Sequence, residues 1–314
     1  MTHFNQVGAI ANSTVANFGP GFDVFGLCLN LGHDKVIIKQ VKEKDISIEI
    51  EGHGSEKIST IPDKNTSGLV AKHILNDFNI NTGLSIKIIK GIRPGSGLGS
   101  SAASAAATSV ALNSLLCLGL SKFDIIKYAM YGEIAAAGAE HADNVAPSIL
   151  GGFTIIRSYD PLDIIKIDPP PNMVLCISLP TIQISTKVAR NILPKEISIK
   201  KMVKNIGNST SIISALYTGN LNLLGKAMED HVVVPARSKL IPNYYEVVNM
   251  AKQEGALGVT ISGAGPAIVA LIDERKTNPK KVINAMKQGF KNVDLDTDDY
   301  VCKPGRGAVI TGLT

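Results

Sequence analysis

The residues best suited to chemistry in this sequence form a short loop, Pro-Gly-Ser-Gly-Leu-Gly-Ser-Ser, at positions 94–101. The loop lies between a segment of alternating apolar and polar residues, 84–90, and a long alanine-rich segment. Glycines let a backbone turn sharply and approach a ligand closely because they have no Cβ atom. The start of a following helix adds free N–H groups and the positive end of the helix dipole. The pattern therefore predicts a phosphate-binding loop.

Two common phosphate-binding patterns do not fit this loop. A Walker A loop requires GxxxxGK followed by Ser or Thr, and no lysine follows Gly99. The dinucleotide pattern GxGxxG has Ser100 at its third glycine position, and Lys87 and Lys90 lie in a strand that such a fold would bury. A plain glycine turn with Ser100 and Ser101 as helix caps explains only part of the pattern. One of these hydroxyls could instead bind Mg²⁺.

Two further segments are rich in glycine and polar residues: ANSTVANFGPGFD at 11–23 and SGAGP at 262–266. Each alone could be a loop without a role in binding. Together with the central loop, and in this order, they resemble the three motifs of the GHMP small-molecule kinases. Those motifs are an N-terminal substrate segment, a central P-x-x-x-G-L-G-S-S-A loop and a C-terminal glycine-rich loop.

Within that family the chain is similar, over nearly its whole length, to the branch that acts on L-homoserine. The matching segments are 16–30, 95–104, 131–147, 184–194 and 234–244. The resemblance implies transfer of the ATP γ-phosphoryl group to the side-chain hydroxyl of L-homoserine, which gives O-phospho-L-homoserine for threonine biosynthesis. ATP and Mg²⁺ are the implied cofactors.

The resemblance also assigns residues to the nucleotide and the metal. The implied nucleotide-binding residues are Asn65, Arg93, Pro94, Gly95, Ser96, Gly97, Leu98, Gly99, Ser100, Ser101, Ala102 and Ala103. Mg²⁺ would be held by Ser101 and Glu133, which offer oxygen ligands of the kind that this ion prefers beside phosphate.

Homoserine is a zwitterion, and the resemblance provides groups for both of its charges. Asp23, with Asn17 in the same motif, matches the position that binds the ammonium group. Arg190 and Arg237 match the pair that binds the carboxylate, a task suited to the planar fork of arginine. The other implied substrate-binding residues are His141, Asn144 and Thr186.

Asp23, Glu133 and Asn144 are the expected catalytic residues, and no base is assigned among them. Other branches of the family place an aspartate near the acceptor hydroxyl, where this chain has Asn144. An amide does not accept a proton at a useful pKa. We therefore expect catalysis by in-line positioning and by charge stabilisation from Mg²⁺ and the helix N-terminus.

Other functions remain open as alternatives. A related kinase could act on mevalonate, a sugar or shikimate, but none of these has an ammonium group to pair with Asp23. A regulatory protein that kept the fold and lost turnover should have lost metal or phosphate residues, yet Ser101, Glu133 and the loop glycines are present. A nucleotide-dependent dehydrogenase would need the dinucleotide pattern that fails above.

The elements that position these residues follow from the apolar periodicity. Strands are predicted at 35–41, 46–51, 84–90, 173–179, 257–262 and 267–272, with a short one at the C-terminus. Helices are predicted at 68–78, after 99, and at 121–138, 200–217, 220–231, 243–253 and 279–290. Their irregular alternation favours an α+β fold.

The proline-containing stretch 160–171 predicts a boundary between two domains, 1–160 and 161–314. The resemblance implies the two-domain GHMP kinase fold, with a left-handed βαβ crossover in the N-terminal domain and a ferredoxin-like C-terminal domain. Similar enzymes are often dimers, so the resemblance leaves a homodimer open.

Composition excludes several other classes of protein. The chain has 314 residues, 45% hydrophobic and 19% charged, and its net charge of +5 is spread without dense basic blocks. With no Trp, it is poorly equipped to bind nucleic acid. The four cysteines are single and lack zinc-site spacing. Without a signal peptide or an apolar run of about 18 residues, we expect no membrane segment and a cytoplasmic location.

Overall fold

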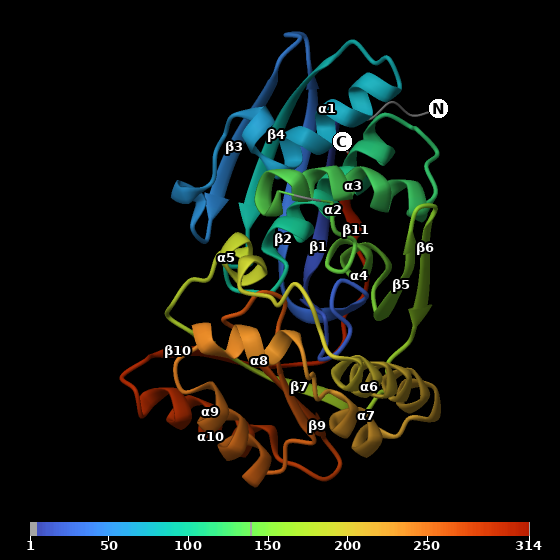
Figure 1. Cartoon of the computed structure of the whole chain (residues 1–314). Helices are drawn as coiled ribbons and strands as arrows, with labels where there is room; N and C mark the ends of the chain where they lie inside the picture. The colour runs from blue at the N-terminus through green and yellow to red at the C-terminus, as the bar shows by residue number, and fades with distance from the viewer. Residues whose placement is uncertain (1–4, 139, 314) are drawn as a thin grey trace.

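The computed structural model describes residues 5–138 and 140–313 of the chain. Residues 1–4, part of the segment examined for a signal peptide, and residue 139, within the motif 131–147, lie outside the described residues. The described elements form two domains, each built on its own sheet and drawn one above the other in Figure 1.

A seven-stranded sheet supports the first domain. Five of its strands run in the order β11-β1-β2-β4-β3, and the hairpin of β5 and β6 joins it at β2. Strands β3 and β4 are parallel and the other pairs are antiparallel, so the sheet is mixed. The bounds are β1 Gln6–Ala16, β2 Phe25–Val41, β3 Ile46–Gly52, β4 Gly83–Lys90, β5 Phe153–Tyr159, β6 Leu162–Ile167 and β11 Val309–Leu313.

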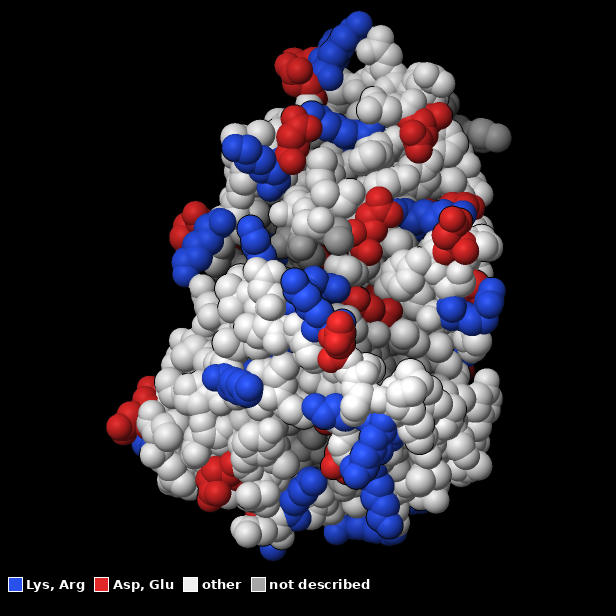
Figure 2. Space-filling view, viewed as in Figure 1, with Lys and Arg blue, Asp and Glu red and all other residues white. Residues whose placement is uncertain are grey.

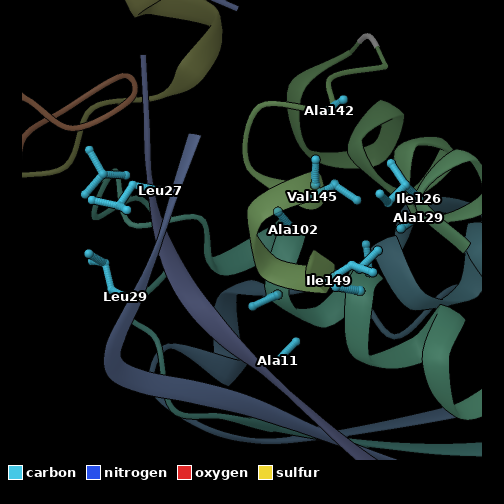
Figure 3. Close-up of a cluster of buried hydrophobic side chains, with 14 of the residues drawn as sticks. Ala11, Leu27, Leu29, Ala102, Ile126, Ala129, Ala142, Val145 and Ile149 are labelled. Carbon is cyan, nitrogen blue, oxygen red and sulfur yellow. The ribbon is translucent and has the colours of Figure 1, made fainter. Parts of the chain in front are cut away.

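Four helices complete the first domain, with bounds α1 Thr66–Asp77, α2 Ser100–Leu115, α3 Lys122–Ala137 and α4 Val145–Leu150. Helix α2 packs on β1 and β2, and α1 and α3 pack on α2. The alanines of α2 are buried, and their small side chains allow a close approach to the sheet. Figure 3 shows Ala102 of α2 among the buried side chains of the neighbouring helices. The core therefore fixes the start of α2, where the predicted phosphate loop ends.

The second domain is built on a four-stranded antiparallel sheet in the order β10-β7-β9-β8. Its strands are β7 Met173–Pro180, β8 Gly258–Ile261, β9 Ile268–Asp273 and β10 Thr297–Cys302. Its helices are α5 Thr186–Asn191, α6 Ile199–Thr218, α7 Leu221–Ala227, α8 Val233–Arg237, α9 Tyr244–Gln253 and α10 Pro279–Lys291. Short 3₁₀ helices lie at Ser55–Lys57 and Pro62–Lys64 in the first domain and at Ser238–Leu240 in the second.

Local sequence explains where several helices begin and end. Asn65 caps α1 by accepting hydrogen bonds from two backbone N–H groups, and Ser121 and Asp124 form a capping box at the start of α3. Helix α6 begins after Ser198, whose side chain caps it, and ends at Gly219 in the left-handed conformation. These caps satisfy backbone groups that would otherwise lack partners.

The expected α+β class is confirmed by these two sheets and their helices. The stretch 160–171 contains more structure than its prolines suggested. Pro161 lies in the turn of the β5–β6 hairpin, and Pro169–Pro171 lead into β7. Strand β6, and β11 near the C-terminus, pair within the sheet of the first domain.

The surface and the helices agree with the composition. On the face shown in Figure 2, acidic and basic side chains are interspersed over the upper domain rather than gathered by sign. Within the described ranges, every helix is too short or too polar to cross a membrane.

Candidate active site

A cavity of about 490 Å³ lies between the two domains and brings together motifs that are distant in sequence. The first domain contributes parts of segments 16–23, 94–101 and 141–144, and the second domain contributes parts of 184–190 and 263–265. Because both domains line the cavity, a molecule bound there would contact both.

The central loop packs directly on the glycine-rich loop of the second domain. The Ser262 hydroxyl donates to the carbonyl oxygen of Gly97 at 2.7 Å. The backbone N–H of Ala267 donates to the carbonyl oxygen of Ser96 at 3.2 Å. A Cβ atom on Gly97 would lie 2.6 Å from the Ser262 carbonyl oxygen, and its φ of +80° is strained for other residues. This contact therefore requires glycine.

The predicted nucleotide residues divide into two groups. The residues that line the cavity are Asn65, Pro94, Gly95, Ser96, Gly97, Gly99, Ser100 and Ser101. Four others lie outside its wall. Arg93 reaches Asp298 of β10 at 3.3 Å, while Leu98, Ala102 and Ala103 are buried in the core. Any contact of these last three with a ligand would have to come from their backbone.

Glu133, on α3, has the features of a cation ligand. Its side chain is buried, and Oε1 has no hydrogen-bond partner among the described residues. Burial raises the pKa of this carboxyl to about 7, opposed by the nearby Ser101 hydroxyl and the Lys90 ammonium. The described residues contain no cluster of three or more His, Cys, Asp or Glu side chains able to hold a metal. Ser101 and Glu133 both line the cavity and offer oxygen atoms, the ligand type that Mg²⁺ prefers.

Lys90 is a residue of this site that the sequence analysis missed. It forms a buried ion pair with Asp34 and donates to the Ser100 carbonyl at 2.8 Å and the Ser104 hydroxyl at 2.9 Å. It thus ties the end of β4 to the first turn of α2. The alternation of side chains along β4 could have indicated that Lys90 is buried, because Lys90 continues the inward-facing series of Leu84 and Ile86.

Asp23 and Arg190, predicted to bind opposite ends of the substrate, bind each other. The two Nη atoms of Arg190 donate to the two carboxylate oxygens of Asp23 at 3.1 and 3.0 Å. The Asp23 backbone N–H donates to Asn17 Oδ1 at 3.1 Å, which fixes the turn that carries the carboxylate. The cavity thus contains a bidentate ion pair of side chains.

Arg237 is held by backbone carbonyls. Its Nη1 donates to Gly263 at 2.7 Å and its Nε to Ala189 at 3.2 Å. Burial lowers the pKa of Arg237 to about 10, so it remains a cation at neutral pH. Asn17 also donates to the Gly263 carbonyl, at 3.3 Å, so this oxygen joins the two domains.

The sequence analysis also missed Phe22. Its ring centroid lies 5.2 Å from the guanidinium carbon of Arg190 and 5.2 Å from that of Arg237. Phe22 lies within the matching segment 16–30, but nothing in its residue type signals a contact with both arginines.

The segment 141–144 places three polar residues on the cavity wall. His141 Nε2 is buried without a partner among the described residues, and burial lowers the pKa of this imidazole. Asn144 Oδ1 accepts a hydrogen bond from the Thr14 hydroxyl at 2.7 Å. Between them, Asp143 was not predicted; it is buried, and burial raises its pKa to about 7. Thr186 also lines the cavity, at the start of α5.

Asn65 lies at the other end of the cavity, and its side chain is occupied with local structure. Oδ1 caps α1, and Nδ2 donates to the Ser59 carbonyl at 2.7 Å. The apolar side chains of Ile50, Ile58 and Ile88 line the cavity with it. These isoleucines, which the sequence analysis missed, make this end of the cavity apolar.

Three buried polar atoms without partners in the described part of the chain belong to residues of this cavity. They are Glu133 Oε1, His141 Nε2 and Arg190 Nε. Buried polar atoms normally find partners, so a concentration of such atoms indicates a polar ligand. The cavity combines an apolar end, a glycine-rich loop at a helix N-terminus, and a charged end.

The chain resembles known proteins over nearly its whole length. Residues 65–152 match the model of the GHMP kinases N terminal domain, and residues 212–292 match that of the GHMP kinases C terminal domain. Homoserine kinases of Methanococcus maripaludis and Methanococcus vannielii are 50% and 47% identical over 308 residues, covering 97% of this chain and 98% of each relative. The crystal structure of homoserine kinase from Cytophaga hutchinsonii has a TM-score of 0.93 at 38% identity and covers 99% of both chains.

Proposed function

This chain belongs to the GHMP kinases and, within them, to the homoserine kinases, and on that premise we propose the reaction of its cavity. The side-chain oxygen of L-homoserine attacks the γ-phosphorus of ATP. The bond from that phosphorus to the β,γ-bridging oxygen breaks, ADP leaves, and the hydroxyl proton is released. The product is O-phospho-L-homoserine, an intermediate of threonine biosynthesis.

One observation carries this proposal: a glycine-rich loop at a helix N-terminus and a pair of opposite charges line the same cavity. Asp23 and Arg190 offer one group for each charge of an amino acid, and Arg237 adds a second cation. A sugar has no charge that could replace either partner of the Asp23–Arg190 ion pair, and a hydroxy acid that took Arg190 would leave Asp23 without a partner. Burying unpaired charge is costly, so the site favours a zwitterion.

ATP is proposed to lie along the cavity with its adenine among Ile50, Ile58 and Ile88 and its phosphates on the central loop. The loop glycines leave room for phosphate oxygens, and the N-terminus of α2 faces them with its dipole. Lys90 supports this arrangement because its ammonium group donates a hydrogen bond to the Ser100 carbonyl and so fixes the first turn of α2.

Mg²⁺ is proposed to bind Ser101 and Glu133, and when bound it would neutralise charge on the transferring phosphate. The orphaned Oε1 of Glu133 supports this assignment, because a buried carboxylate oxygen without a donor suits a cation.

The substrate is proposed to exchange partners with the ion pair of the free site. Its ammonium group replaces Arg190 on Asp23, and its carboxylate replaces Asp23 on Arg190 and reaches Arg237. Asn17 and His141 lie beside this position, and Thr186 borders it. One ion pair is broken, and the substrate forms an ionic contact with Asp23 and one with each arginine, so no charge is left unpaired.

Proton removal is proposed to need no dedicated base. Thr14 occupies Oδ1 of Asn144, which leaves its Nδ2 to donate to the acceptor hydroxyl and orient it. The loose transition state of phosphoryl transfer requires little early deprotonation. Alignment of the hydroxyl with the γ-phosphorus, together with charge stabilisation, then supplies most of the rate.

The test is ADP release from Mg·ATP with L-homoserine, L-threonine, L-serine, mevalonate, galactose and shikimate as acceptors. We expect turnover with homoserine above all others. Asp23→Asn should raise the KM for homoserine, and Asn144→Ala should lower kcat. Preferred turnover of mevalonate or galactose would overturn the assignment of Asp23. Loss of kcat in Asp23→Asn at unchanged KM would make Asp23 a base and contradict the mechanism.

We also propose the finer fold assignments. The parallel strands β3 and β4, joined through α1, are the candidates for the left-handed crossover. The order β10-β7-β9-β8 supports a ferredoxin-like second domain. The proposed domains are 1–160 and 161–314, with β6 and β11 as the parts of the second segment that complete the first sheet.

Finally, we propose a homodimer formed through α6. Ile199, Val203, Ile206 and Tyr217 are exposed on this helix, at spacings that place them near one face. An apolar stripe of this length suits a second copy across a twofold axis. Val203→Asp should convert a dimer to a monomer in sedimentation equilibrium, whereas Val293→Asp, at another exposed valine, should not. A monomeric unaltered chain would contradict the proposal.

A further inference from the structure

Phe22 is placed in the cavity by a tightly bonded turn. The Gly21 N–H donates to the Asn17 carbonyl at 3.0 Å, and the Phe25 N–H donates to the Gly21 carbonyl at 2.8 Å. Asp23 has a φ of +57°, an uncommon value for a non-glycine residue. The turn brings two adjacent side chains, Phe22 and Asp23, to the same cavity wall.

The surroundings of Phe22 present an electrostatic difficulty. Arg190 and Arg237 both approach its ring, and two guanidinium groups in one partly buried cavity repel each other. Asp23 neutralises Arg190, but the described residues place no carboxylate within ion-pair distance of Arg237. The π face of an aromatic ring carries partial negative charge and attracts cations. Phe22 thus contacts both cations without occupying their hydrogen-bond donors.

We propose that Phe22 is a positioning residue of the substrate site, which holds the guanidinium groups of Arg190 and Arg237 in place for one carboxylate. This inference rests on the proposed function, in which the two arginines bind the carboxylate of homoserine. When the substrate takes Asp23 away from Arg190, the ring contact remains. Phe22 therefore preserves the orientation of Arg190 through the exchange of partners.

Replacement of the ring by an aliphatic side chain of similar size tests this role. Phe22→Leu should raise the KM for L-homoserine about tenfold, the scale expected for losing one or two partly buried cation–π contacts. The kcat and the KM for ATP should stay within about twofold of the unaltered enzyme, because the ring acts on carboxylate binding. Phe22→Tyr keeps the aromatic face and should restore the KM.

A substrate without the carboxylate charge separates positioning from general damage. The unaltered enzyme should prefer L-homoserine to L-homoserine amide in kcat/KM, and Phe22→Leu should reduce that preference by about the same tenfold factor. Phe22→Met should behave like Phe22→Leu and serves in its place if the leucine variant does not fold. Phe123→Leu, at an exposed phenylalanine of α3, is the matched control and should leave the preference unchanged.

Equal loss of kcat/KM for homoserine and its amide, or a fall in kcat at constant KM, would overturn the proposal for Phe22. Failure of the unaltered enzyme to phosphorylate homoserine would instead overturn the proposed function. The two failures are therefore distinguishable in a single set of assays.

Discussion

Glu133 combines two properties that rarely coexist in one side chain: deep burial and an oxygen without a donor among the described residues. Its proposed role as a Mg²⁺ ligand depends on negative charge, because the amide of glutamine is a much weaker ligand for this ion. Glu133→Gln should therefore lower kcat/KM for Mg·ATP on the order of 100-fold or more. Steady-state assays over a range of Mg²⁺ concentrations measure this effect. Glu246→Gln, at an exposed glutamate of α9, is the control, and full activity of Glu133→Gln would refute the assignment.

Asp143 should make stability depend on pH. Burial raises its pKa from the ordinary 3.8 to about 7, so between these values the folded chain binds more protons than the unfolded chain. The contribution of Asp143 to the free energy of unfolding therefore falls as pH rises through this window. Asp143→Asn should gain roughly 4 kcal/mol over the unaltered chain at about pH 8 and less than about 1 kcal/mol near pH 4. Urea unfolding at both pH values tests this, and an equal difference at both would contradict it.

The residues of the cavity differ in how far the sequence predicts them. Asp23, Glu133 and Arg190 were accessible because they lie in motifs whose family role is known. Phe22 and Asp143 were not, because their surroundings come from segments far away in the chain. Phe22 meets Arg237, more than 200 positions along, and only the folded chain brings them together.

Among the elements, the contact between the two glycine-rich loops imposes the strictest requirement. Gly97→Ala would place a Cβ atom 2.6 Å from Ser262 and 2.8 Å from Gly265, at a φ of +80°. We expect a loss of roughly 3 kcal/mol or more of unfolding free energy, from backbone strain and steric overlap together. The KM for ATP should also rise.

Gly119→Ala is the matched control for this prediction. Gly119 has a φ of +66°, and nothing lies within 4 Å of a Cβ atom built on it. It should lose only about 1–2 kcal/mol, the contribution of backbone strain alone. Urea denaturation of both variants measures the difference. Equal losses would mean that the contact between the loops contributes nothing.

The sequence predicted elements well where one face is apolar and poorly where polar residues are buried. Strand β4 and helices α6, α9 and α10 closely follow their predicted ranges. Strand β1 was missed because it buries Ser13 and Thr14 within a polar motif. Thr14 finds its partner in Asn144, far along the chain, so no local pattern indicates that it is satisfied. Strand β6 was not predicted because prolines precede and follow it in the sequence.

At the scale of the whole molecule, the site depends on both domains. A ligand that binds the folded chain at 100 times its Kd should add about 2.7 kcal/mol to the unfolding free energy. Mg·ATP and L-homoserine should therefore each raise the Tm. Asp23→Asn should abolish the shift with homoserine and keep that with Mg·ATP, as measured by differential scanning fluorimetry. Loss of both shifts would mean that the variant disturbs the whole cavity.

The pairing of β1 with β11 has a consequence for how the chain can be connected. Val7 lies opposite Leu313, so the first and last strands are direct neighbours in the upper sheet. A circular permutation that links these two strands could therefore open the chain at an exposed loop such as 42–45, between β2 and β3. The second domain lies between β6 and β11 in the sequence, so it is connected to the first domain at both of its ends.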